Sequence, residues 1–495
     1  MFCEECGSPI SAGALFCEEC GCKIASIPEA PENNQKENIA EYGIIYTNLG
    51  LLSQQLGKPQ EELKRIIDDF ISEASIRCIG YELLDVSQQI NGLGTVEDHV
   101  NIIKSEVSVN HQKYLFILGS NTVIPSIVWP NYASDCEHDP DISSDFPYST
   151  LDIQNPFEGQ FYDFDEYLRV GRLPNVDFEN YFSNLKSACG KINQIKTFGL
   201  SAEVWTEETK DIYSEIKAGP NVYDSPDVNL QNVISVIPDE TNLMLFNLHG
   251  SSQTRFWYGQ RLQEYPEAIE PLSFNNISNP YFLAVEACYG AAYEGRAASD
   301  SVLLTSLSGK CISFLGSSRI AFGKPYPAGS CADVICGEYL KNLKSNLSAG
   351  DSLSKAQAEL LQDECSPNEI KTLAEFSLYG DPSARISGLP EIKKTLFSKS
   401  KSNSKSFSKG IVVPQPDIRR AVKMQLIEVE QKIKDTAISF INTQYKEFSD
   451  IQPKYFGDGK NIINAVFSKE SLIGKRILSV QMNKKGEITD FVESK

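Results

Sequence analysis

Apolar runs and helical stretches alternate along the chain from Tyr42 onwards, and this alternation constrains the fold more than any other feature of the sequence. The run GIIYTNL is followed by the stretch PQEELKRIIDDFISEASIRC, then by YELLDV, VEDHVNIIKSEV and KYLFILGS. The later runs LMLFNLHG, YFLAVEACYG and CISFLGSS continue the pattern. Because parallel strands need long crossover connections, the pattern predicts an α/β fold with a mainly parallel sheet flanked by helices.

The chain is long enough to contain several modules. It has 495 residues, and a single hydrophobic core stops growing near roughly 250–300 residues. Changes in composition predict a small N-terminal module at 1–25, a linker at 26–41, the α/β domain at 42–392, a Ser/Lys-rich linker at 393–412 and a small α+β domain at 413–495.

Four cysteines near the N-terminus have the spacing of a zinc site. Two CEEC pairs stand ten residues apart, each followed by glycine, and two such knuckles close a tetrahedral thiolate site. The segment resembles the short zinc ribbons of bacterial multidomain proteins. We therefore expect a structural Zn²⁺ with no open coordination position, held by Cys3, Cys6, Cys17 and Cys20.

Composition and charge exclude several classes of partner. No run approaches the ~20 apolar residues that a membrane helix needs, and the start MFCEECGSPI has no signal-peptide pattern. The net charge of -20 argues against general binding to nucleic acid or anionic membrane. We expect a cytoplasmic protein with reduced thiols.

Reactive and small residues follow three of the predicted strands. His249 and Gly250 end one run, Cys288 ends the next, and Ser317 ends a third. Ligands bind beyond the carboxyl ends of parallel strands, and a thiol beside an imidazole is a nucleophile with its own acid/base. The amide of Gly250, which has no side chain in the way, could stabilise an oxyanion together with the amide of Cys288. A lone buried cysteine is usually a core residue, but the pairing with His249 favours catalysis.

The segments LFNLHG and FLAVEACYG resemble the caspase-haemoglobinase cysteine peptidases, which include caspases, legumains and gingipains. YLFILGSNTVIPS, YLRVGRLP, FLGSSRIAFG and EFSLYGDPSARI bring the likeness closest to the gingipains. The resemblance implies a caspase-like core with His249 as general acid/base and Cys288 as nucleophile. It also implies that the amides of Gly250 and Cys288 form the oxyanion hole, and that Asp165 or Glu166 orients His249.

The same resemblance leaves the substrate preference open. Glu286 lies two residues before Cys288, where a carboxylate would favour Lys or Arg in the substrate. Legumain-like enzymes also carry Glu-Ala-Cys and prefer Asn, and Glu286 could instead pair with an internal Arg such as Arg319. We expect Glu286 and Ser317 to contact the substrate.

The C-terminal part of the sequence predicts a separate module. From Asp417 the sequence predicts an amphipathic helix, followed by the strands NIINAVFS, RILSVQM and EITDFVES, the last two joined by an Asn-Lys-Lys-Gly turn. The predicted apolar stripe of that helix comprises Ile418, Val422, Leu426, Val429, Ile433, Ala437 and Phe440. Substrate docking, autoinhibition and partner binding all remain open for it.

These observations predict an intracellular cysteine endopeptidase that cleaves partner proteins after Lys or Arg and is controlled by a regulatory protein partner. Self-processing is a further hypothesis, because the Ser/Lys-rich linker offers Lys399, Lys401, Lys405 and Lys409, and the alternative is that this linker is a plain spacer. The alternative is a catalytically silent caspase-like scaffold that binds proteins through the zinc ribbon and the C-terminal domain.

Overall fold

The computed structural model describes most of the chain beyond the predicted zinc ribbon. The ribbon, the linker after it up to residue 38 and the Ser/Lys-rich linker lie outside the described residues. Residues 40–495 form one compact unit. The described range is 39–495 apart from 108–111, 159, 162–163, 189–191, 193, 217–221, 325–328, 362–364, 388–418, 421–423, 459–460 and 472.

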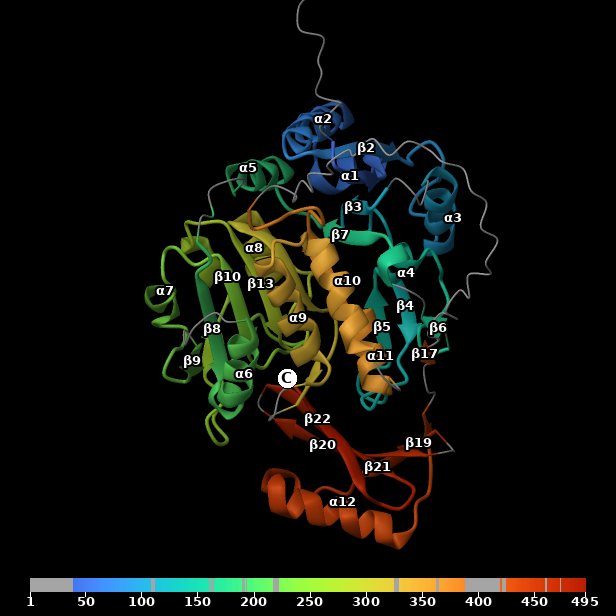
Figure 1. Cartoon of the computed structure of the whole chain (residues 1–495), viewed down its shortest axis with the longest axis vertical. Coiled ribbons are helices and arrows are strands. Elements are labelled where there is room, and N and C mark those ends of the chain that lie inside the picture. The colour runs from blue at the N-terminus through green and yellow to red at the C-terminus, as the bar shows by residue number, and fades with distance from the viewer. Residues whose placement is uncertain are drawn as a thin grey trace, which may run out of the picture. The chain divides into compact units, whose positions relative to one another are not determined.

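A ten-stranded sheet forms the centre of this unit (Figure 1). Neighbouring strands are parallel except for β14 and β16, so the predicted mainly parallel sheet is confirmed. The strands, in their order across the sheet, are β2 (Ile79–Asp85), β1 (Glu41–Thr47), β3 (Tyr114–Leu118), β7 (Arg169–Leu173), β16 (Phe376–Gly380), β14 (Cys311–Ser317), β13 (Tyr281–Glu286), β10 (Leu243–Asn247), β8 (Thr197–Ala202) and β9 (Val222–Ser225).

Helices flank the sheet and begin where the sequence supplies caps. Thr95 and Ser366 each form a capping box at a helix start, which satisfies amides that the helix leaves free. The helices bury their apolar faces in one large core that includes the strands. They are α1 (Leu49–Leu56), α2 (Gln60–Ile76), α3 (Val96–Glu106), α4 (Phe146–Thr150), α5 (Phe178–Ala188), α6 (Thr206–Ile216), α7 (Val233–Val236), α8 (Val302–Ser308), α9 (Ala332–Lys344), α10 (Ala349–Leu360) and α11 (Pro367–Glu375). Short strands outside the main sheet are β4 (Ile127–Pro130), β5 (Asp141–Ser144), β6 (Gln160–Phe161), β11 (Trp257–Tyr258), β12 (Glu267–Ile269) and β15 (Phe322–Gly323). None of the helices in the described ranges is long and apolar enough to cross a membrane.

The C-terminal module is a helix packed on an antiparallel sheet. Its strand order is β15-β22-β21-β20-β19-β18, so the edge strand β15 belongs to the α/β part of the chain. A core around Ile433, Ala437, Phe467 and Leu478 joins the helix to the sheet. The elements are β18 (Gln425–Leu426), α12 (Gln431–Gln444), β19 (Lys454–Gly457), β20 (Ile462–Ser471), β21 (Gly474–Asn483) and β22 (Ile488–Ser494). The short strand β17 (Arg419–Arg420) precedes them and pairs with β6 instead.

Three of the predicted strands and their turn are confirmed, but the predicted start of the helix is wrong. The helix α12 begins at Gln431 rather than near Asp417. Leu426, placed on the helix stripe by its spacing, pairs with Phe456 in a sheet and is 64% exposed. The spacing suggested a helix because a short apolar series cannot distinguish a helix from edge strands.

Candidate active site

His249 and Cys288 lie just beyond the ends of two adjacent strands. In the register of β10 and β13, Asn247 pairs with Glu286, the last residue of each strand, and His249 and Cys288 each follow two residues later. Gly250 passes so close that a Cβ there would lie 1.8 Å from the carbonyl oxygen of Cys288. Any side chain at 250 would therefore separate the two strand ends.

The imidazole of His249 is held by an amide that the sequence did not mark. Its Nε2 lies 2.7 Å from Oε1 of Gln260, whose own Nε2 donates to the carbonyl of Leu262 at 2.9 Å. This second bond fixes Oε1 toward the ring, and because a carbonyl oxygen only accepts, the neutral ring carries its proton on Nε2. Nδ1 is thereby left as the basic nitrogen.

The surroundings keep that ring neutral. Trp205 and Tyr265 pack on it with ring centroids 4.3 and 5.3 Å away. Burial, with a smaller contribution from the cation of Arg476, lowers the pKa of His249 well below its usual value.

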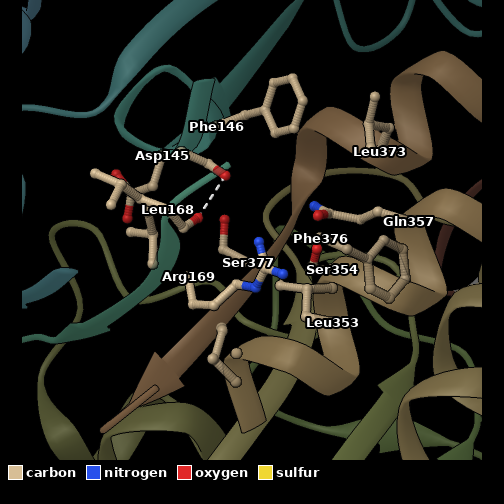
Figure 2. Close-up of a pocket in the computed structure, with 14 residues that line it drawn as sticks. Asp145, Phe146, Leu168, Arg169, Leu353, Ser354, Gln357, Leu373, Phe376 and Ser377 are labelled. Atoms are coloured by element: carbon tan, nitrogen blue, oxygen red, sulfur yellow. Dashed lines mark hydrogen bonds between the residues drawn. The ribbon is translucent and has the colours of Figure 1, made fainter. Parts of the chain in front are cut away.

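The two acids expected to orient His249 lie elsewhere. Asp165 and Glu166 are exposed in a short 3-10 helix, and Asp165 lies 3.5 Å from Arg169. Arg169 lines the pocket in Figure 2, together with Asp145 and Gln357, and neither His249 nor Cys288 lines it. The hydrogen bond found at the ring of His249 is the one to Gln260.

Cys288 sits at the start of a strained turn. Tyr289, the next residue, has a φ of 54°, in the left-handed region that non-glycine residues rarely adopt. Its amide donates to the carbonyl of Arg319 at 2.7 Å. The thiol of Cys288 points to the carbonyl of Ala321, with Sγ and O 3.7 Å apart. Burial raises the pKa of Cys288 to about 12, so the thiol is protonated in this arrangement.

A buried lysine supports the loop that faces Cys288. Lys371 lies 2.9 Å from a carboxylate oxygen of Asp135 and of Glu375, and its ammonium donates to the carbonyl of Ile320. The amide of Ile320 donates to Asp139 at 2.9 Å. These contacts fix the backbone at 320–321, and the positive charge of Lys371 opposes the rise in the pKa of Cys288.

The chain's own residues 493–495 lie against Cys288 as an added strand. The amide of Cys288 donates to the carbonyl oxygen of Lys495 at 3.2 Å, and the amide of Lys495 donates to Ala321 at 2.9 Å. Ser494 and Glu493 pair antiparallel with Phe322 and Gly323 of β15. Extended peptides commonly bind sheet edges in this way.

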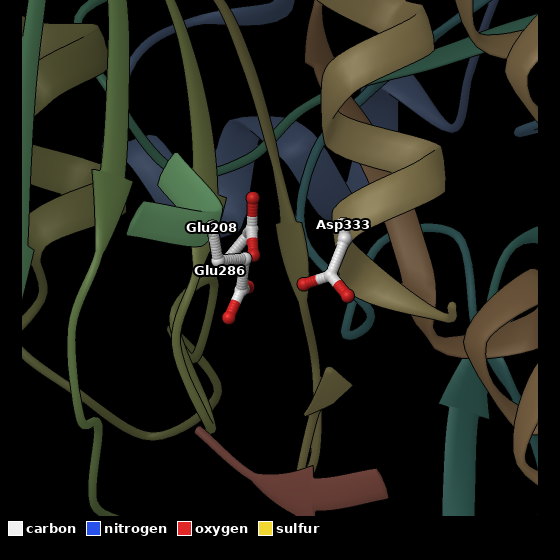
Figure 3. A group of neighbouring side chains, drawn as sticks. All are labelled: Glu208, Glu286 and Asp333. Carbon is white, nitrogen blue, oxygen red and sulfur yellow. The ribbon is translucent and has the colours of Figure 1, made fainter. Parts of the chain in front are cut away.

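The side chain of Lys495 lies among three buried carboxylates. Figure 3 shows these three acids, Glu208, Glu286 and Asp333. Nζ of Lys495 contacts Glu208 and lies 3.5 Å from Asp333 and 3.8 Å from Glu286. It also lies 4.4 Å from the ring centroid of Trp205, over the face of the indole. Glu208 and Asp333 come from the first turns of α6 and α9, and Glu286 ends β13.

The pocket is built for a cation with several donors. Both carboxylate oxygens of Glu286 lack a hydrogen-bond partner within the described part of the chain. Burial and the nearby Asp333 raise the pKa of Glu208 and of Glu286 well above the usual value, and Lys495 opposes this rise. Burial also disfavours the ammonium of Lys495, but Glu208, Asp333 and Glu286 outweigh it and raise the pKa of Lys495. A guest cation therefore relieves repulsion among the three acids.

Gly323 forms one wall of this pocket. A Cβ at that position would lie 2.0 Å from Cε of Lys495 and 2.6 Å from a carboxylate oxygen of Asp333. The lysine stem thus passes through space that any other residue at 323 would fill.

The structure also gives the contacts of two further residues named from the sequence. Arg319 pairs with Asp141 at 2.6 Å rather than with Glu286. Ser317 is buried at the end of β14, where its hydroxyl donates to the carbonyl of Arg319 and accepts from the amide of that residue. Ser317 therefore shapes the turn behind the site.

Comparisons with known proteins show the family and the fold of the chain. A model of peptidase family C25 matches residues 81–387, and no curated protein matches the sequence. The crystal structure of the Arg-specific cysteine proteinase gingipain R (RGPB) superposes with a TM-score of 0.54 at 11% identity, covering 92% of this chain and 98% of that chain. The complex of Porphyromonas gingivalis RgpB pro- and mature domains gives a TM-score of 0.51 at 11% identity, covering 91% of this chain and 99% of that chain. The structural likenesses establish the shared fold, and the family match covers more than half of the sequence. The chain is a cysteine endopeptidase that belongs to peptidase family C25.

Proposed function

We propose that this endopeptidase cleaves polypeptides on the carboxyl side of lysine. The observation that carries the proposal is the placement of Lys495. Its carbonyl oxygen meets the amide of Cys288 while its ammonium lies among Glu208, Glu286 and Asp333. A substrate lysine bound in the same way would present its carbonyl carbon to the thiol of Cys288.

Each group at the site then has a step to perform. Nδ1 of His249 takes the thiol proton, and the sulfur of Cys288 attacks the carbonyl carbon. The resulting oxyanion accepts hydrogen bonds from the amides of Cys288 and Gly250. The imidazolium gives its proton to the leaving amine, and a water activated by His249 releases the acyl group from sulfur.

The pocket favours lysine over arginine. An ammonium has three donors that can point to three separate carboxylates, whereas the planar guanidinium suits two parallel bonds to one carboxylate. Here the carboxylates come from three different elements and surround one point, with one oxygen of each within 4.8 Å of the others. The comparison protein gingipain R is named as Arg-specific, so this preference would distinguish the two.

A panel of fluorogenic peptides tests the proposal, with Lys, Arg, Asn or Asp before the reporter. The proteins are wild type, Cys288→Ala and Lys495→Ala, the last included because its pocket is vacated. We expect the Lys peptide to be hydrolysed fastest, in a reaction that depends on the thiol, and we expect no hydrolysis by Cys288→Ala. Turnover that survives in Cys288→Ala, or a preference for Asn or Asp, would reject the assignment.

Four further expectations from the sequence are part of the proposed function. They are a structural Zn²⁺ on Cys3, Cys6, Cys17 and Cys20, a cytoplasmic location, a regulatory protein partner and self-processing in the Ser/Lys-rich linker. The RgpB pro- and mature domain complex is a precedent for a protein domain bound to a peptidase of this fold.

A further inference from the structure

We propose that β22, together with Lys495 that follows it, acts as an intramolecular, substrate-like inhibitor, and that the C-terminal module must leave the site before a substrate can enter. The inference rests on the proposed function for what the opened site does. The closed arrangement itself rests on contacts that are independent of catalysis.

The backbone of the segment occupies the place of a substrate. Residues 493–495 pair with 321–323, and the amide assigned to the oxyanion hole is already bonded to the carbonyl of Lys495. No second strand can pair with the same edge of β15 while β22 is there, because Glu493 and Ser494 already pair with that edge. A substrate and β22 therefore compete for one edge.

Each of the last three side chains is also fixed. Glu493 accepts from the indole of Trp205 at 2.5 Å and from Arg476 at 3.0 Å. The hydroxyl of Ser494 accepts from the amide of Ile477 at 2.9 Å. Lys495 fills the acidic pocket and is 1% exposed. Trp205 thus contacts both Glu493 and Lys495, and it packs on His249 as well.

An apolar contact seals the nucleophile under the C-terminal sheet. From the α/β part, Cys288, Ile320, Phe322 and Cys331 contribute to one buried cluster. The C-terminal module contributes Met424, Phe456, Val466, Ile477 and Val492 to the same cluster. In this arrangement His249 is 2% exposed and Cys288 is 5% exposed, which leaves neither accessible to a polypeptide.

The module can leave as a unit because its remaining hydrophobic core is separate. This core contains Ile433, Ala437, Ile441, Phe467 and Leu478, and none of these residues belongs to the buried cluster that contains Cys288. Departure would expose the apolar cluster and leave three carboxylates around an empty centre. A partner or substrate that supplies another lysine would remove the repulsion among the three carboxylates.

The test measures access to Cys288 without using turnover. Wild type, Lys495→Ala and the control Lys485→Ala are treated with iodoacetamide, and alkylation of Cys288 is followed by peptide mass spectrometry. Lys485 is exposed in the turn between β21 and β22, so its removal leaves the pocket filled. We expect Cys288 in Lys495→Ala to react about tenfold faster or more than in wild type, with Lys485→Ala unchanged.

A second variant covers the case in which the three acids simply take up protons and β22 stays. Lys495→Glu adds a fourth carboxylate to the pocket and forces the segment out. Alkylation of Cys288 at the wild-type rate in both Lys495 variants would overturn the inference.

Adding the segment as a separate peptide controls for a general loss of structure in the variants. The peptide FVESK should protect Cys288 of Lys495→Ala from alkylation, whereas FVESA should not. Equal protection by both peptides, or by neither, would contradict the role of the lysine. Faster alkylation and specific protection without peptide hydrolysis would uphold the inhibitory segment and reject the proposed function instead.

Discussion

The backbone amide of Cys288 donates to the carbonyl oxygen of Lys495 across 3.2 Å. Glu286, two residues earlier, lies 3.8 Å from the ammonium of the same lysine. One stretch of chain therefore contacts both the backbone and the side chain of a bound lysine. In the proposed function, this arrangement links the position of bond cleavage to the lysine before it.

Loss of either member of the catalytic pair should abolish peptide hydrolysis. Cys288→Ala removes the nucleophile and His249→Asn removes the base, so each should lower kcat/KM in the Lys495→Ala background by about 10³-fold or more. Cys78→Ala, which changes a thiol outside the site, is the control and should keep its activity. Retention of activity in Cys288→Ala would mean that the nucleophile is another group.

The acids of the pocket should control the choice of lysine. In the same background, Glu208→Gln or Asp333→Asn should lower kcat/KM for a Lys peptide by about 10- to 100-fold, because a buried ammonium loses one of its charge partners. Glu207→Gln is the matched control, since Glu207 is the neighbouring residue but is exposed and pairs with Lys210. An equal loss with Lys, Arg and Asn peptides would show that these acids serve folding rather than specificity.

Gln260 should position His249 rather than react. Gln260→Ala should lower kcat by about tenfold, because the ring loses the bond that keeps Nδ1 basic. Gln260→Glu places a carboxylate at Nε2 and should raise the pKa of His249, which moves the acidic limb of the kcat/KM profile to higher pH. The exposed Gln253→Ala is the comparison. An acidic limb that stays in place in Gln260→Glu would contradict the role.

The closed form, in which β22 and Lys495 occupy the site, should become less stable relative to an open form as the pH rises. Burial raises the pKa of Cys288 to about 12 in the closed form, so this form binds the thiol proton more tightly than an open form with an ordinary thiol. The stability that this thiol proton gives to the closed form is fully present below the pKa of Cys288 in the open form. It is lost as the pH rises toward about 12. Alkylation of Cys288 in wild type should keep rising with pH through the alkaline range, whereas in Lys495→Ala it should level off at lower pH. Identical profiles would contradict this linkage.

The sequence predicted the parts of the site that follow from strand order. Apolar runs showed where β10 and β13 end, and the residues just beyond them are His249 and Cys288. Glu286 was found because it precedes Cys288 on the same strand. These predictions depend on local sequence alone, which periodicity can reveal.

The rest of the pocket depends on tertiary packing. Glu208 and Asp333 lie in first turns of helices, where acidic residues are common and signal nothing beyond a helix start. Gln260 follows the short strand β11 and has no pattern around it. Lys495 could not be assigned to the site from sequence, since only the pairing of β22 with β15 brings it there.

The predicted zinc ribbon has its own test. Purified protein should contain about one zinc per chain by elemental analysis, and Cys17→Ser should lower this content because it removes one of four thiolates. Cys22→Ser, just outside the pattern, should not lower it. Zinc well below one per chain in wild type, or an equal loss in Cys22→Ser, would reject the ribbon.

The most direct test of a lysine-selective nucleophile at Cys288 is covalent labelling by peptidyl chloromethyl ketones. Lys495→Ala is incubated with a Lys or an Arg ketone of otherwise equal sequence, and the modified residue is identified by peptide mapping. An adduct on Cys288 should form, about tenfold faster or more with the Lys reagent than with the Arg reagent. No adduct on Cys288, or equal rates with the two reagents, would contradict a cysteine endopeptidase whose pocket selects lysine.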